Sequence, residues 1–72
     1  MTTLGLYLAK KFINKAELCR QTGITTNRMH ALTLSENSLL RAEELYLISL
    51  AMEVEPGELM KELFKGKKLP KK

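Results

Sequence analysis

The sequence has no tryptophan and no aspartate, and it has only one cysteine and one histidine. A single cysteine cannot form an internal disulfide, and one cysteine with one histidine cannot supply the usual ligands of a metal site. The same shortage leaves no nucleophile and base to act together, and there is no glycine-rich loop for a phosphate. We therefore expect no catalytic residues, no metal and no cofactor, and we do not expect an enzyme.

Long apolar stretches are also missing from the 72 residues. None approaches the ~20 apolar residues needed to span a bilayer, and the first three residues lead into the first helical pattern without a signal peptide. A chain with one cysteine and no such segment is expected in a reducing, cytoplasmic setting, away from membranes.

The composition that remains is 44% hydrophobic and 28% charged, which is ordinary for one small globular domain. The net charge of +4 suits a polyanionic partner, although five of the twelve basic residues lie after Phe64. We expect a domain over residues 1–66, followed by a basic disordered tail over residues 67–72, which has too little apolar content to order itself.

Residues 14–33 predict two helices joined by a tight turn. Asn14 is placed to cap the first helix, and Gly23 supplies the positive φ that ends it. Thr25 is placed to cap a second helix that begins at Thr26. This pattern is typical of a helix-turn-helix, whose second helix enters the DNA major groove.

The remaining sequence predicts three more helices and no strand. One covers residues 4–12, one covers residues 39–52 with Ser38 as its cap, and the last begins at Pro56 and is stopped by Gly66. The fold class is therefore all-α, with five helices in one compact domain. Helical spacing predicts a core of Leu4, Leu8, Leu18, Cys19, Ile24, Met29, Leu32, Leu45, Ile48, Met52, Leu59 and Leu63.

Three segments resemble the lambdoid phage repressor/Cro group, also called the XRE family. Cys19 is followed four residues later by Gly23 and then by apolar residues at the helix-turn-helix spacing. The segment Ile13–Leu18 resembles the family's Leu-Ser-Gln-Glu-Glu-Leu, and residues 52–59 resemble its Leu-Gly-Val…Glu-Leu. The resemblance covers roughly residues 4–64 and implies the lambda repressor-like fold, with double-stranded DNA as the partner.

The same resemblance implies a division of roles among the polar residues. Base-reading positions of the family fall on Thr26, Asn27, Arg28 and Ala31. Asparagine can pair with adenine and arginine with guanine, and methyl groups can touch thymine. The alternative is that these residues are a solvated helix start. His30, beside them, is interpreted as a surface histidine.

Phosphate contacts are expected from Lys15, Thr25 and Arg41. Lys15 stands at a helix start, where the family has a phosphate-binding glutamine and where backbone amides favour an anion. One departure from the family concerns its buried Arg–Glu pair, whose two positions are Leu8 and Thr33 here. Because both partners are absent together, no buried charge is left alone.

An apolar surface formed by Tyr46, Leu47 and Leu50 is expected on the longest helix. Exposed apolar residues of this kind favour a protein partner. The first hypothesis is a repressor that binds a palindromic site as a homodimer. The second is an antitoxin-like interaction module that uses this surface, with DNA binding secondary or absent.

Overall fold

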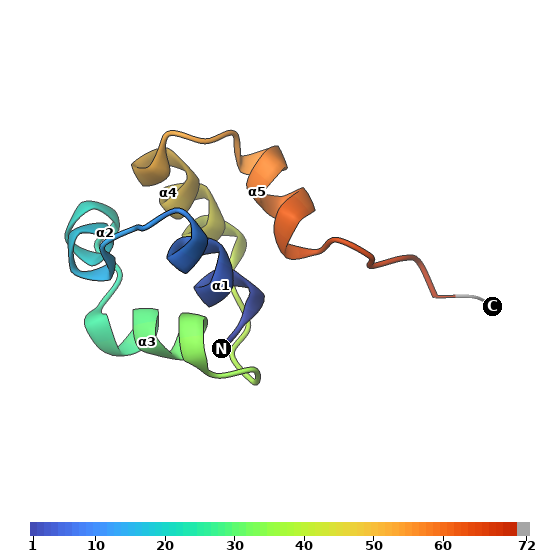
Figure 1. Ribbon diagram of the computed structural model, residues 1–72, viewed down its shortest axis with the longest axis horizontal. Helices are drawn as coiled ribbons and strands as arrows, with labels where there is room; N and C mark the ends of the chain where they lie inside the picture. The colour runs from blue at the N-terminus through green and yellow to red at the C-terminus, as the bar shows by residue number, and fades with distance from the viewer. Residues whose placement is uncertain (71–72) are drawn as a thin grey trace.

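The computed structural model describes residues 1–70, and within them it contains five helices and no strand. The helices are α1 (Thr3–Lys10), α2 (Lys15–Thr22), α3 (Thr26–Leu34), α4 (Ala42–Met52) and α5 (Pro56–Leu63). Figure 1 shows α1 at the centre, with α3 across one end of the molecule and α4 and α5 at the other. The predicted all-α class is confirmed. Over residues 1–70, no helix has both the length and the apolar character required to cross a membrane.

Nine apolar side chains from all the helices and the α2–α3 turn form the core, and all nine were predicted. They are Leu4, Leu8, Leu18, Ile24, Met29, Leu32, Leu45, Ile48 and Leu59. The other three predicted core residues, Cys19, Met52 and Leu63, are only partly buried and pack against this cluster. Because α3 contributes Met29 and Leu32, its orientation depends on the same core that holds the whole domain.

The predicted start of the fourth helix is wrong. α4 begins at Ala42 and not at Leu39, and its N-cap is Arg41 and not Ser38. Glu44 reaches back to accept a hydrogen bond from the Arg41 backbone N–H at 2.9 Å, which closes the first turn. The Leu39 carbonyl is instead bound by the Arg28 guanidinium at 2.7 Å. Arg28 of α3 thus binds a backbone carbonyl at Leu39, a residue that the sequence pattern assigned to the fourth helix.

Thr2 joins the start of α1 to the end of α3. Its hydroxyl accepts from the Gly5 N–H at 3.0 Å and donates to the Leu32 carbonyl at 2.7 Å. Its own backbone N–H donates to the Thr33 carbonyl at 2.9 Å. Gly5 is buried where a Cβ would collide with that same Thr33 carbonyl oxygen. The absence of a side chain at Gly5 therefore allows α1 to approach α3 closely. From the sequence alone, only the unfavourable helix propensity of glycine is apparent.

Candidate nucleic-acid interface

Local hydrogen bonds build the helix–turn–helix unit from α2 and α3. The Asn14 Oδ1 accepts from the Glu17 N–H at 3.2 Å at the start of α2, and Gly23 has φ 79° at its end. The Thr25 Oγ1 then accepts from the Arg28 N–H at 3.1 Å at the start of α3. These bonds confirm the two predicted caps and the glycine turn. They fix the point at which α3 begins and the direction in which it leaves α2.

One face of α3 is exposed along its length. Met29, Leu32 and Thr33 are buried, whereas Thr26 and Asn27 lie in solvent. Ala31, one turn after Asn27, is partly buried. The structure therefore brings three of the four predicted base-reading residues to the outer side of a well-anchored helix.

His30 is also on this outer side. It is exposed, as expected for a surface histidine, and it lies one turn after Thr26. With Lys15, it borders a shallow hollow of about 140 Å³ between α2 and α3. Sequence reasoning set His30 apart from the base readers, but the helical spacing from Thr26 could have placed it on their face.

Arg28 departs from the expected arrangement because its side chain turns away from the outer face of α3. Its Nε donates to Glu44 Oε2 at 2.8 Å, and its Nη2 donates to Glu44 Oε1 at 2.9 Å. Glu44 is only 7% exposed, and a carboxylate in that position needs a partner. The hydrogen bonds from Arg28 hold the pKa of Glu44 below its usual value, against the opposing effect of burial.

The Arg28–Glu44 ion pair was not predicted from the sequence. No local sequence pattern marks Glu44, because its partner lies sixteen residues away, beyond any helical period. The family's usual pair is absent here, since Leu8 and Thr33 are both buried without charge. The new pair instead ties the start of α3 to the start of α4.

The three predicted phosphate-contacting residues lie at different places: Lys15 reaches the last turn of α3, Thr25 caps its first turn, and Arg41 precedes α4. Lys15 is the first residue of α2, and its Nζ donates to the Thr33 Oγ1 at 3.3 Å. Arg41 is exposed and is linked to Arg28 through Glu44. Thr25 is exposed, and its hydroxyl already serves as the α3 cap.

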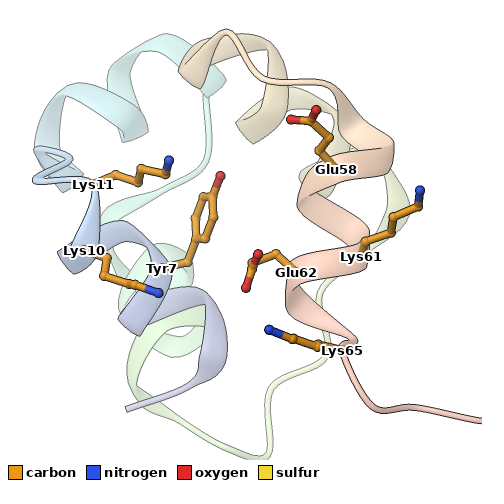
Figure 2. Close-up of a pocket in the computed structure, with 7 residues that line it drawn as sticks. All are labelled: Tyr7, Lys10, Lys11, Glu58, Lys61, Glu62 and Lys65. Carbon is orange, nitrogen blue, oxygen red and sulfur yellow. The ribbon is translucent and has the colours of Figure 1, made fainter.

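A second charged region lies between α1 and α5, away from α3. It is an open cleft with a volume of about 590 Å³. Figure 2 shows the side chains that line it: Tyr7, Lys10, Lys11, Glu58, Lys61, Glu62 and Lys65. The Lys11 ammonium lies 5.6 Å from the centre of the Tyr7 ring. Four lysines and two glutamates line the cleft, so its charge is mixed with an excess of lysine.

The arrangement of α2, turn and α3 within a five-helix domain agrees with a comparison of the sequence with known families. Residues 3–62 match the model of the Cro/C1-type helix-turn-helix DNA-binding domain. The chain belongs to this family. No curated protein and no solved structure matched the chain. The Cro/C1-type assignment confirms the resemblance drawn from the sequence and supports a DNA-binding regulator with DNA as its partner. Domains of this type are typically not enzymes.

The expected apolar surface on α4 is present in part. Tyr46 and Leu50 are each 53% exposed, while Leu47 is partly buried. Figure 1 shows that the C-terminal half of α4 lies at the end of the molecule opposite α3. The exposed apolar residues that this Cro/C1-type domain carries on α4 are therefore Tyr46 and Leu50.

Proposed function

We propose that this Cro/C1-type domain is a sequence-specific transcriptional repressor that inserts α3 into the DNA major groove. The observation that carries the proposal is the exposed start of α3, where Thr26 and Asn27 face solvent while Met29 anchors the helix below. A helix held in this way can present its side chains to base edges without moving.

Asn27, Thr26 and Ala31 are the proposed base readers. Asn27 can make a bidentate contact with adenine, and the methyl groups of Thr26 and Ala31 can contact thymine. A direct base contact by Arg28 would first have to separate it from Glu44. Such a contact would give up the hydrogen bonds to Glu44 and to the Leu39 carbonyl, and it would leave the largely buried Glu44 carboxylate without its charged partner. Arg28 therefore acts by positioning α3.

Lys15, Thr25 and Arg41 are proposed to contact phosphates on either side of the groove. Lys15 combines a positive charge with the free amides at the start of α2. The lysines after Gly66 add a sequence-independent attraction, although Lys71 and Lys72 lie outside the described residues. The chain acts in the cytoplasm, as a homodimer on a palindrome, with half-sites about one helical turn, ~34 Å, apart.

The test compares Asn27→Ala with Lys15→Ala on a selected site and on random duplex at several salt concentrations. Asn27→Ala should cost about 1–3 kcal/mol on the selected site and little on random DNA. Lys15→Ala should weaken both equally and lower the salt slope by about one. Lys61→Ala removes the same charge from α5 and serves as the control.

If Asn27→Ala weakens binding to the selected and the random duplex equally, Asn27 does not contact bases. A wild-type protein that binds neither duplex at low salt would contradict the proposal itself.

A second candidate function rests on the exposed Tyr46 and Leu50. An antitoxin-like interaction module would use this end of α4 to hold another protein, with DNA binding secondary. The double substitution Tyr46→Ser/Leu50→Glu separates the two functions. It should leave half-site DNA binding unchanged if α3 is the DNA-binding element, and it should abolish a protein complex if α4 is the binding surface.

A further inference from the structure

The outer face of α3 is centred on His30. At about 100° per residue, His30 lies between Thr26 and Asn27 around the helix axis, ~40° from the first and ~60° from the second. Leu34 lies one turn further along the same face. These four residues of α3 are exposed, whereas Ala31 is partly buried at the edge of the face. His30 is therefore the side chain nearest the middle of the surface that is proposed to enter the groove.

The imidazole of His30 makes no hydrogen bond and no ion pair within residues 1–70, and only the His30 backbone carbonyl accepts a bond, from the Thr33 hydroxyl at 3.3 Å. Lys15 and Cys19 of α2 are the titratable groups that line the shallow hollow beside His30. No carboxylate lines this hollow, and α3 carries no acidic residue. The ring is thus available to a ligand, and its charged neighbour is positive.

Arg28 leaves the outer face of α3 without its expected guanine reader. Guanine presents two acceptors in the major groove, N7 and O6, and a cationic donor is their usual partner. Hydrogen bonds to Glu44 and to the Leu39 carbonyl hold the Arg28 guanidinium away from this face. The other exposed residues of α3 are uncharged. His30 is therefore the one side chain of this face that can carry a positive charge to a base.

We propose that His30 enters the major groove in its protonated form and donates a hydrogen bond to the N7 of a guanine. A protonated imidazole donates from both ring nitrogens and accepts from neither, so it suits an edge that presents only acceptors. Adenine suits it less well, because the N6 amino group beside its N7 is a donor. This inference rests on the function proposed for α3 and deepens it, since it adds the base that His30 selects and a proton that binding takes up.

A contact made by protonated His30 links DNA affinity to pH. Histidine is the side chain that ordinarily changes its charge between about pH 5 and 8, and this chain has a single histidine. The negative charge of DNA favours the protonated ring and also offsets its repulsion from Lys15. The DNA-bound state therefore holds this proton more tightly than the unbound protein does. Because such coupling is reciprocal, DNA affinity rises as the pH falls.

DNA affinity measured between about pH 5.5 and 7.5, for wild type and His30→Gln, tests the proposal. On a selected site, wild-type affinity should rise as the pH falls, by up to about tenfold per pH unit for one proton. His30→Gln keeps a polar side chain that cannot be charged, so its affinity should be nearly independent of pH. Replacement of the contacted guanine by 7-deazaguanine removes the N7 acceptor, and it should abolish the pH response of wild type.

Two controls separate the proton from other effects. Asn27→Ala should weaken binding to the selected site at every pH and keep the pH response, because Asn27 carries no proton in this range. The N-terminal amine, which lies 4.0 Å from Glu36, is the same in wild type and His30→Gln, so any response left in the variant belongs to such groups. Thermal unfolding of His30→Gln should match wild type across the range, because His30 is exposed.

Site-specific binding that does not depend on pH would overturn this inference and leave the function proposed for α3 intact, as would a pH response that survives in His30→Gln. An equal pH response on random duplex would assign His30 to a phosphate and overturn the base contact, and so would a selected site in which no 7-deazaguanine weakens binding. A wild-type protein that binds neither duplex at any pH would instead reject the function proposed for α3.

Discussion

At the scale of single residues, the Arg28–Glu44 pair connects α3, the proposed DNA-binding helix, to α4. The pair joins the first turn of α3 to the first turn of α4 and also orders the Arg41 backbone. Glu44 is therefore one residue through which pH acts on the stability of the fold. Hydrogen bonding from Arg28 lowers its pKa below 4.5 in the folded chain, so the folded state binds this proton less readily than the unfolded state.

We expect this contribution to be complete above the ordinary glutamate pKa of 4.5 and to disappear as the pH falls through the lower, folded value. Glu44→Gln should cost about 1–3 kcal/mol at pH 7, because charged hydrogen bonds are replaced by neutral ones. The measurement is thermal unfolding of both proteins between pH 7 and 3. The difference between their unfolding temperatures should shrink as the pH falls. A difference that does not depend on pH would contradict the role assigned to Glu44. Glu62→Gln, on the exposed side of α5, is the control.

At the scale of elements, the contact between α1 and α3 determines how α3 is held. Thr2 binds the last carbonyls of α3, and Gly5 lets the two helices approach closely. The other side of α3 packs against α2, with Lys15 reaching the Thr33 hydroxyl. The end of α3 is thus held from both sides by groups outside the helix.

Gly5→Ala is predicted to destabilise the domain by about 1–3 kcal/mol, because the new methyl group overlaps the Thr33 carbonyl. Helix propensity alone predicts the opposite, a gain of up to about 1 kcal/mol. Gly57→Ala is the matched comparison, since it lies in α5 with no atom near the position of a Cβ. It should be neutral or stabilising. Chemical denaturation of the two variants would measure their free energies of unfolding. A Gly5→Ala protein more stable than wild type would show that α1 can move away from α3 to accommodate the methyl group.

At the scale of the whole molecule, the excess of positive charge lies in the last six residues of the sequence. Four of the twelve basic residues lie after Gly66, and without them the chain would carry equal numbers of basic and acidic residues. Other lysines line the mixed-charge cleft between α1 and α5 (Figure 2). Long-range attraction to DNA is therefore expected to come from the end of the chain, while selectivity comes from α3.

Removal of residues 67–72 should weaken binding to selected and random DNA by the same factor. The salt slope should fall by up to about four, one for each lysine that contacts phosphate. The folded domain should keep its unfolding temperature, because Lys67 to Pro70 are exposed and outside the helices. Affinity measured against salt concentration is the test, and a loss confined to the selected site would place the tail among the base-reading elements. The boundary at residue 66 remains a prediction until this truncation is made.

The sequence by itself determined the class of fold, the helix-turn-helix and most of the core. The features responsible are local: Asn14 and Thr25 cap helices through atoms three residues away, and Gly23 permits a left-handed turn. Apolar residues at helical spacing then indicate which faces meet, and nine of the twelve expected core residues are buried. Such effects act within about one helical turn, so they can be read without knowing the fold.

Only the tertiary structure decided the start of α4 and the direction of the Arg28 side chain. Each depends on groups far apart along the chain. The Arg28 side chain could extend into solvent or turn toward α4. It turns toward α4 because the carboxylate of Glu44, sixteen residues away, is buried by packing and binds it. Removal of the Glu44 carboxylate from water makes its pairing with Arg28 energetically important. This desolvation exists only after the helices have packed together.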